Sequence, residues 1–252
     1  MEFQDKSVLV TGAGSGFGAA IAEAFGRKGA KVVVSDLRLE AAREVADRIE
    51  RAGGRGVAVQ ADVTDESSMR RLREIAMAEV GVLDVIVNNA GATQPLGPAE
   101  ALSEAELDRL LNVNIKGLYW SVVTFTGDLK SRGKGVVLNI ASVGVNHPRP
   151  GLAWYNATKG AVATLTRALA LELAPHKIRV CAINPAAAYT PLLRETLGRN
   201  DNEATLRQFA SAIPLGRLCD PADVAAAATF LASDDAGFVT GVCLDVDGGR
   251  SL

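Results

Sequence analysis

Cysteine and histidine are scarce in this sequence of 252 residues, which contains three Cys and two His. Cys181, Cys219 and Cys243 lie far apart and are odd in number, so they predict neither a disulfide framework nor a metal cluster. We expect free thiols in a reducing cytoplasm, and no metal site. His147 lies in the turn-like stretch NHPRP and is a candidate substrate contact, although an isolated histidine is more often structural or solvated.

The sequence also lacks a basic excess, a long apolar run and a signal-peptide profile. It has 27 Lys and Arg against 29 Asp and Glu, a formal net charge of -2, which argues against a nucleic-acid partner. No apolar run is long enough to span a bilayer, and the opening residues MEFQDKSVLV lead almost at once into a strand. We therefore expect a cytoplasmic protein with neither a nucleic-acid nor a membrane partner.

Short β-branched runs alternate along the chain with amphipathic helical segments. The predicted strands are 6–12, 31–36, 55–63, 83–91, 135–142, 178–185 and 241–249. The predicted helices are 18–30, 39–54, 65–81, 103–125, 154–173 and 221–233, with Asp65 or Ser67 as the cap of the third. This alternation predicts an α/β fold, a Rossmann-type doubly wound parallel sheet of about seven strands with helices on both faces. Ligands of such sheets bind at the carboxyl ends of the strands.

One domain, 1–252, accounts for the whole chain, because no linker or low-complexity tract divides it. The least regular stretch follows the sixth predicted strand. We expect a substrate lid around 186–215, since a long insert at a strand end lies over the ligand. The alternative is a surface excursion with no role in binding.

A glycine cluster, TGAGSGFG at residues 11–18, joins the first predicted strand to the first helix. Glycines allow the backbone to approach a pyrophosphate, and the helix N-terminus offers free N–H groups to the anion. The cluster opens the first βαβ unit, which is the context that supports a dinucleotide site. The general G-x-G-x-x-G/A spacing fits Gly14, Gly16 and Ala19, a register that we regard as accidental.

Asp36 ends the second predicted strand, at the distance beyond Gly16 where an acidic residue is expected to bind the adenosine ribose. A carboxylate there accepts hydrogen bonds from both ribose hydroxyls and repels a 2′-phosphate, which favours NAD over NADP. Arg38 points the other way, because it can reach a 2′-phosphate. The alternative for Asp36 is a helix N-cap.

The ends of the third and fourth predicted strands offer further cofactor contacts. Asp62 can bind the adenine through its carboxylate and Val63 through its backbone, or Asp62 can cap the next helix. The small residues of the stretch NNAG, 88–91, leave room for a flat ligand, or simply form a tight turn.

Tyr155 and Lys159 lie about one helical turn apart at the start of a predicted helix, so both side chains leave the same face. An unperturbed phenol has a pKa of about 10. A neighbouring ammonium favours the phenolate, so we expect Lys159 to lower the pKa of Tyr155 and also to hold ribose hydroxyls.

Two more polar residues belong with this pair. Ser142 ends the fifth predicted strand, upstream of Tyr155, where its hydroxyl can donate to a carbonyl oxygen. Asn114 interrupts the long helix, where a local bulge can free a backbone carbonyl to hold a water. Capping, packing or solvation explains each residue alone, but the four converge where a nucleotide is independently expected.

These motifs resemble those of the classical short-chain dehydrogenase/reductase family along essentially the whole chain. The family's T-G-x-x-x-G-x-G motif matches Thr11, Gly12, Gly16 and Gly18. Its NNAG motif matches residues 88–91, and its catalytic tetrad matches Asn114, Ser142, Tyr155 and Lys159. The resemblance implies a nicotinamide cofactor and usually a homotetramer. The expected cofactor contacts are Thr11, Gly12, Ser15, Gly16, Phe17, Gly18, Asp36, Leu37, Asp62, Val63, Asn89, Ala90, Gly91, Tyr155, Lys159, Pro185 and Thr190.

One position departs from the family pattern. The family often has P-G after the sixth strand, and this chain has Pro185 followed by Ala186. Alanine restricts positive φ, so the turn differs or does not need that conformation. The resemblance also implies that Thr190 contacts the nicotinamide carboxamide.

The predicted function is hydride transfer between NAD(H) and a secondary alcohol or ketone, such as a sugar, polyol or cyclic alcohol. The alternatives are a 3-ketoacyl-thioester reductase acting on an acyl carrier protein and, less favoured, a non-catalytic nucleotide sensor. The small-molecule substrate is expected to contact Gln94, Val143, Gly144, His147, Trp154, Tyr189 and Leu192. Any of these residues can instead belong to the core or to subunit contacts.

Overall fold

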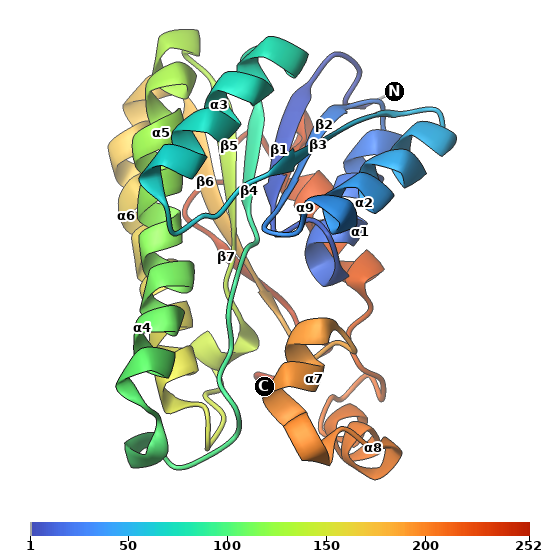
Figure 1. Ribbon diagram of the computed structural model, residues 1–252, viewed down its shortest axis with the longest axis vertical. Helices are drawn as coiled ribbons and strands as arrows, with labels where there is room; N and C mark the ends of the chain where they lie inside the picture. Colours follow the sequence, from blue (N-terminus) through green and yellow to red (C-terminus); the bar gives the residue numbers. More distant parts are fainter. Residues whose placement is uncertain (1) are drawn as a thin grey trace.

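The computed structural model describes residues 2–252, and seven parallel strands form its centre (Figure 1). The strands are β1 (Ser7–Thr11), β2 (Lys31–Asp36), β3 (Arg55–Gln60), β4 (Val85–Asn88), β5 (Gly135–Ile140), β6 (Ile178–Pro185) and β7 (Cys243–Val246). Their order in the sheet is β3-β2-β1-β4-β5-β6-β7, and every neighbouring pair is parallel. The direction of winding reverses between β1 and β4, which makes this the expected binding crevice. The predicted doubly wound fold is confirmed.

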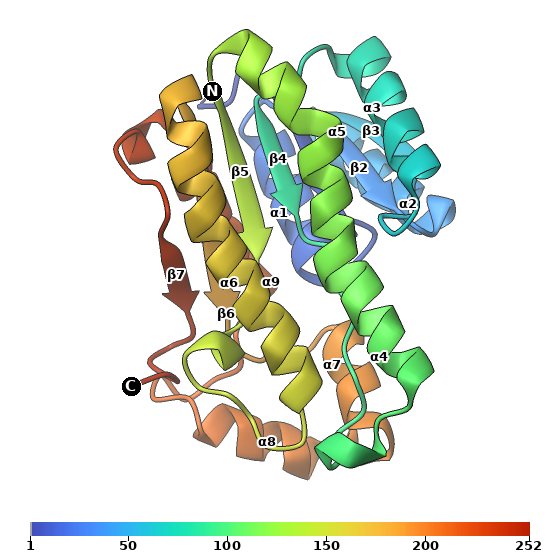
Figure 2. The ribbon, with the colours of Figure 1, turned by 90° about the vertical axis from the view of Figure 1, so that its left-hand side faces the viewer.

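Helices cover both faces of the sheet (Figures 1 and 2). One layer contains α1 (Gly16–Arg27), α2 (Leu39–Arg51) and α9 (Pro221–Ala232). The other contains α3 (Glu66–Val80), α5 (Gly117–Arg132) and α6 (Ala153–Leu173). Because helices cover both faces of the sheet, its strands carry apolar side chains on both faces. Val8 of β1 packs into one core cluster and Leu9 into the other.

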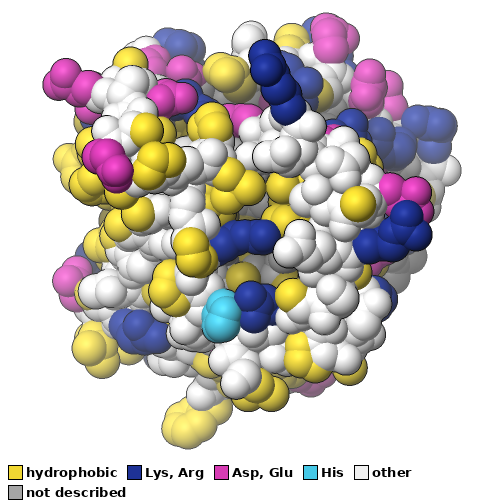
Figure 3. Space-filling model, turned by 90° about the horizontal axis from the view of Figure 1, so that it is seen from below, with side chains coloured by type: hydrophobic (Ala, Val, Ile, Leu, Met, Phe, Trp, Pro, Cys, Tyr) yellow, Lys and Arg dark blue, Asp and Glu magenta, His cyan; other side chains and the backbone are white. Residues whose placement is uncertain are grey.

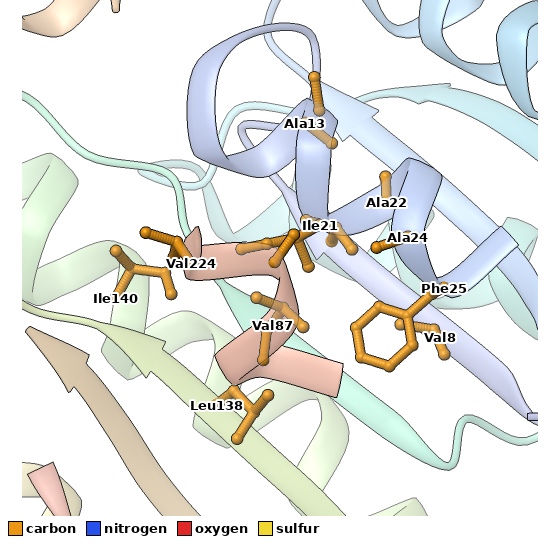
Figure 4. Packing of buried hydrophobic residues seen from close by; sticks show 14 of the residues in the cluster. Val8, Ala13, Ile21, Ala22, Ala24, Phe25, Val87, Leu138, Ile140 and Val224 are labelled. Atoms are coloured by element: carbon orange, nitrogen blue, oxygen red, sulfur yellow. The ribbon is translucent and has the colours of Figure 1, made fainter. Parts of the chain in front are cut away.

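The larger core lies between the sheet and the α1–α2–α9 layer. Ile21 and Phe25 of α1 and Val224 of α9 pack there against strand residues such as Val87 and Leu138 (Figure 4). All five side chains are fully buried. Burial of this kind stabilises the fold by about 1.5–3 kcal/mol for each large side chain, and it fixes the strand ends that carry the site.

The long predicted helix at 103–125 is one helical rod with a change of pitch (Figure 2). It begins as α4 (Glu104–Leu111), held by a capping box between Ser103 and Glu106, and continues as α5. Residues Asn112–Lys116 between them form a π-helical turn. The predicted polar interruption is therefore a bulge in the helix. Bulges of this kind are frequent at functional sites.

Several predicted boundaries were wrong at the carboxyl ends of the strands. β3, predicted to reach residue 63, ends at Gln60, and β4, predicted to reach 91, ends at Asn88. There the chain leaves the sheet because side chains satisfy its backbone; for example, Ser68 accepts a hydrogen bond from the Asp62 N–H at 2.9 Å. Asp65 rather than Ser67 caps α3, accepting a bond from the Ser68 N–H.

The irregular segment at 186–215 contains α7 (Pro191–Leu197) and α8 (Glu203–Ser211). Both helices lie beyond the carboxyl ends of the strands, at the bottom of Figures 1 and 2. Within the described chain, none of the helices combines the length and the apolar composition that crossing a bilayer requires.

Candidate active site

A cavity of about 370 Å³ opens between the carboxyl ends of the strands and α7. Figure 3 shows this face from below: it is hollowed, basic side chains cross its middle, and acidic side chains lie toward its edge. The predicted residues that line the cavity are Gly12, Ser15, Gly16, Phe17, Asp36, Asn89, Ala90, Gly91, Ser142, Val143, Gly144, His147, Tyr155, Lys159, Pro185, Thr190 and Leu192. Most of the residues predicted from separate stretches of sequence therefore share one cavity.

The glycine turn forms a cradle that only glycine permits. Gly12 and Gly16 have φ values of +60° and +54°, and a Cβ on Gly12 would lie 2.8 Å from Ala90 Cα. α1 begins at Gly16, and the side chain of its N-cap residue, Ser15, makes no capping hydrogen bond. The first N–H groups of α1 thus face the cavity without a side-chain acceptor, an arrangement that suits a pyrophosphate.

Thr11, Gly18 and Asn89 hold this cradle against β4. The Thr11 hydroxyl accepts hydrogen bonds from the Asn89 and Ala90 N–H groups, both at 3.2 Å. The Asn89 amide donates to the Thr11 and Gly12 carbonyl oxygens, both at 2.9 Å. A Cβ on Gly18 would lie 2.3 Å from the Gly12 oxygen. Thr11 and Gly18 do not line the main cavity, and they support the turn that does.

Asp36 lies in the cavity beside this turn. Its carboxylate accepts hydrogen bonds from the Gly14 N–H at 2.9 Å and the Arg38 N–H at 3.0 Å. The alternative that Asp36 caps a helix is wrong, because α2 begins at Leu39 with Arg38 in the N-cap position. The Arg38 side chain lies 3.8 Å from the carboxylate, and the predicted contact Leu37 is 61% exposed and outside the cavity.

Asp62 and Val63 also lie outside the main cavity. The Asp62 carboxylate accepts from the Thr64 N–H at 2.9 Å and the Thr64 hydroxyl at 2.8 Å, so it closes its own turn. The cap of α3 is Asp65 and not Asp62. Val63 lines a smaller cavity and packs against Gly117 of α5.

Tyr155 and Ser142 face the same cavity from α6 and from the end of β5. Burial raises the pKa of Tyr155, and a hydrogen bond with the Ser142 side chain lowers it by less. The expectation that Lys159 lowers this pKa is wrong in this structure. The Lys159 Nζ donates to the Ile140 carbonyl oxygen at 2.9 Å and lies 5.9 Å from the centre of the Tyr155 ring.

Lys159 is itself strongly perturbed. Burial lowers its pKa from 10.5 to about 8, since the side chain is only 4% exposed. Tyr155 and Lys159 lie close together, as their spacing of one helical turn predicted. The electrostatic result differs because burial raises the pKa of Tyr155 by more than the hydrogen bond with Ser142 lowers it.

Asn114 lies behind the cavity, on the π-helical turn. Its amide donates to the Ala92 carbonyl oxygen at 3.0 Å and the Thr158 hydroxyl at 2.9 Å, and its oxygen accepts from the Ala92 N–H at 2.8 Å. A separate cavity of about 20 Å³, lined by Asn114 and Lys159 among others, lies here. It is large enough for one water molecule.

Ala186 does not distort the turn after β6. Only Asp5 and Lys177 have positive φ among the non-glycine residues that the structure describes. The Ala186 N–H donates to the Val246 oxygen at 3.1 Å, so the residue continues the sheet pairing. Thr190 is buried opposite the glycine turn, its Cγ2 3.3 Å from the position of a Cβ on Gly16.

Three of the predicted substrate residues are engaged elsewhere. The Gln94 side-chain oxygen accepts the Tyr155 N–H at 2.9 Å, so this buried residue supports the start of α6. The Trp154 indole N–H donates to the Ala99 oxygen at 2.9 Å and ties α6 to a loop. Tyr189 faces another hollow, beside Arg217. The prediction that these three line the pocket was wrong, because spacing alone does not give side-chain direction.

Other cavity residues were not predicted. Thr196 and Glu195 of α7, Phe209 of α8, and Arg149 in the turn after β5 all line it. One feature of the sequence could have indicated Arg149, namely its position between Ser142 and Tyr155. Phe209 had none, because it comes from a helix far beyond Tyr155 in the sequence.

The comparisons with known proteins agree with this geometry. A family model described as "Enoyl-(Acyl carrier protein) reductase" matches residues 12–251. A 4-formylbenzenesulfonate dehydrogenase of Comamonas testosteroni is 45% identical over 252 residues, all of both chains. A 3beta-hydroxysteroid dehydrogenase of Eggerthella lenta is 41% identical over 255 residues, 100% of this chain and 95% of the other.

A crystal structure of a 3-ketoacyl-(acyl-carrier-protein) reductase from Brucella melitensis, complexed with NADH, superposes with a TM-score of 0.92. Its sequence is 44% identical, and the match covers 99% of this chain and 100% of that chain. The chain belongs to the classical short-chain dehydrogenase/reductase family. It is therefore an oxidoreductase of a class that uses nicotinamide cofactors.

Proposed function

We propose that this protein is a dehydrogenase that prefers NAD and interconverts a ring-bearing or polyol secondary alcohol and its ketone. The observation that carries the proposal is the shared cavity. Ser142, Tyr155 and Lys159 line it together with Gly12, Ser15, Gly16 and Phe17 of the glycine turn. A bound nicotinamide cofactor supplies the acceptor or donor of hydride.

The side chains supply binding and proton transfer. The Ser142 hydroxyl is suited to donate to the substrate oxygen and steady it as charge develops. Tyr155 removes the hydroxyl proton in oxidation and returns it in reduction. Lys159 is suited to hold ribose hydroxyls. The cavity of about 20 Å³ between Asn114 and Lys159 supports a water relay for the proton.

Asp36 supports the preference for NAD. Its carboxylate lies in the cavity and is held by two backbone N–H groups, so a 2′-phosphate there would meet a fixed negative charge. Arg38 is the residue that would relax this preference, since it lies beside the carboxylate.

The names of these two relatives point to ring compounds rather than long acyl chains as substrates. The two dehydrogenases are named for a benzenesulfonate and for a steroid, one charged and one neutral. Their names therefore leave the charge of the substrate open. Residues 186–215, with α7 and Phe209 lining the cavity, are proposed as the lid. A homotetramer remains an expectation of the family resemblance, and a cytoplasmic location remains an expectation of the cysteine usage and the opening residues.

Reduction of a 3-ketoacyl thioester is the second candidate, favoured by the description of the Brucella structure and of the family model. Comparing rates with an acetoacetyl thioester and with cyclic ketones, each with NADH and NADPH, separates the two. A non-catalytic sensor would bind the cofactor and convert neither the thioester nor the cyclic ketones.

The direct test is Tyr155→Phe, with Tyr119→Phe as the matched control because Tyr119 is exposed on α5. We expect the first variant to lose activity by about a thousandfold or more while calorimetry shows nearly unchanged NAD binding. The control should behave like the wild type. Activity retained in Tyr155→Phe would refute the assigned acid–base group.

The raised pKa of Tyr155 gives a direction for pH dependence. The phenol is protonated at neutral pH, the form that donates in ketone reduction. Oxidation needs the deprotonated form, so its kcat/KM should rise with pH while that of reduction falls.

A further inference from the structure

Arg149 is a cation in the substrate cavity with no anionic partner. It lies in the turn between Ser142 and Tyr155, is partly buried, and lines the same cavity as both. Among residues 2–252, no carboxylate pairs with its guanidinium, and its side chain makes no hydrogen bond. Partial burial of a cation that no anion balances is costly, which points to an anionic ligand.

The guanidinium is held in place by an aromatic face. Its Cζ lies 3.6 Å from the centre of the Phe209 ring, which α8 brings over the cavity. Its backbone is fixed as well, since the Arg149 oxygen accepts from the Asn156 amide at 3.0 Å. Stacking occupies the face of the guanidinium and leaves its N–H edge free for a bidentate acceptor.

The charges around Arg149 do not neutralise it. Glu195 is an acidic residue in the same lining, and it is paired with Arg109 at 2.8 Å. Asp36 belongs to the glycine turn and is held by backbone N–H groups there. Arg250 comes close enough to lower the pKa of Arg149, in addition to the larger effect of burial. This end of the cavity is therefore positive and lacks a counter-charge from the described chain.

We propose that Arg149, stacked on Phe209, binds a carboxylate or sulfonate group of the substrate. The inference rests on the proposed dehydrogenase function and refines its substrate class. The substrate is then an alcohol or ketone that bears an acid group at some distance from its reacting carbon. Arg149 orients the substrate by binding that acid group while Ser142 and Tyr155 bind its alcohol or ketone oxygen.

A purely structural role for Arg149 makes a different prediction. If it only held α8 over the cavity, its loss would weaken charged and neutral ligands alike. If it binds an anion, its loss removes only the advantage of the charged ligand. A pair of ligands that have the same shape and differ in charge separates the two roles.

The experiment measures binding of 4-acetylbenzoate and 4-acetylbenzamide to the full-length protein with NAD⁺, a combination that cannot react. We expect the wild type to bind the benzoate at least about tenfold more tightly, as for a charge-assisted bond. Arg149→Met should abolish that preference and leave amide binding within about threefold of the wild type. Arg149→Lys keeps the charge without the planar fork, so it should keep part of the preference.

Arg194→Met is the matched control, because Arg194 stacks on Tyr189, 4.7 Å from its ring centre, and does not line the cavity. It should keep the full preference for the benzoate. Equal binding of the two ligands by the wild type, or a preference that survives in Arg149→Met, would overturn the proposal. Thermal unfolding of each variant identifies any that fail to fold, and the wild-type comparison tests the proposal without a variant.

The same two ketones, given with NADH, keep this proposal separate from the proposed function. Preferential binding of the benzoate without oxidation of NADH would support Arg149 and refute the dehydrogenase. Turnover of both ketones at equal kcat/KM would support the dehydrogenase and refute the role of Arg149.

Discussion

The pKa of Lys159 is determined by the surroundings of its side chain. The side chain is 4% exposed and its Nζ donates to the Ile140 oxygen, so water no longer solvates the ammonium. Its pKa falls to about 8 for this reason. Below that value the folded chain carries a buried charge that the unfolded chain carries in water. The site is thereby maintained at a cost in stability, as is common for functional groups.

This perturbation predicts a pH-dependent stability that Lys159→Met removes. Between the folded pKa of about 8 and the unfolded value of 10.5, the unfolded chain binds more protons, so the wild type gains stability as pH rises. From pH 7 to 9.5 this gain is about 2 kcal/mol for the wild type relative to the variant. Urea unfolding at the two pH values measures it.

The comparison between the curves cancels groups common to both proteins, such as the buried cysteines. Lys130→Met, an exposed lysine at the end of α5, should follow the wild-type curve. Parallel curves for the wild type and Lys159→Met would show that the ammonium is not desolvated as the structure indicates.

At the scale of elements, α6 depends on a residue outside itself. Its N-cap position is Leu152, whose side chain has no acceptor, so the N–H groups of the first turn need partners from elsewhere. Gln94, in the loop after β4, accepts the Tyr155 N–H at 2.9 Å and donates to the Gly151 oxygen at 3.5 Å. Gln94 therefore positions the helix turn that carries the phenol.

Removing this remote cap by Gln94→Leu should cost about 0.5–2 kcal/mol of stability. It should also lower kcat by about tenfold through a misplaced Tyr155, with little change in the KM for NAD. Gln94→Glu keeps an acceptor, and its charge suits a helix N-terminus, so it should restore most of both losses. Urea unfolding and steady-state kinetics are the measurements. A lowered kcat in both variants alike would argue against capping as the cause.

Specific contacts join α7 to the loop that follows β4. The Thr93 and Thr196 hydroxyls lie 2.8 Å apart, and the Leu96 N–H donates to the Thr196 oxygen at 3.3 Å. These bonds connect α7 to the loop that also carries Gln94. The loop after β4 thus contacts both α7 and the start of α6.

Across the whole molecule, the cavity lies where the two halves of the sheet diverge. Asp36 and the glycine turn belong to the β1–β2 half, and Ser142 and Pro185 to the β5–β6 half. A dinucleotide that touches both should stabilise the whole fold by mass action. At 100 times its Kd the gain is about 2.7 kcal/mol, or a Tm increase of about 5–10 °C for a chain of this size.

NAD should raise the Tm more than NADP at equal concentration, because Asp36 opposes a 2′-phosphate. Asp36→Ser should shrink the NAD shift and enlarge the NADP shift, since Arg38 then faces the phosphate without a neighbouring carboxylate. Asp47→Ser, at an exposed position on α2, is the control and should leave both shifts unchanged. The shifts are compared within each variant, because Asp36 also accepts the Gly14 N–H. A larger NADP shift in the wild type would reverse the proposed cofactor preference.

Local chemistry was enough to predict much of this protein from its sequence. The alternation of apolar strands and amphipathic helices predicted the doubly wound sheet, and β6 was predicted with its observed bounds, 178–185. The glycine turn, Asp36, Ser142 and Tyr155 were placed at one edge of the sheet, and they share one cavity. These predictions held because backbone periodicity and strand polarity act over short stretches of chain.

Tertiary structure alone decided the rest. It turned Gln94 and Trp154 away from the cavity and toward backbone groups that they hydrogen-bond. It raised the pKa of Tyr155, where a neighbouring lysine had predicted the opposite. It also brought Phe209 to Arg149, although the two lie far apart in the sequence. The physical reason is that burial and long-range neighbours set side-chain direction and charge, and neither is encoded in the spacing along the chain.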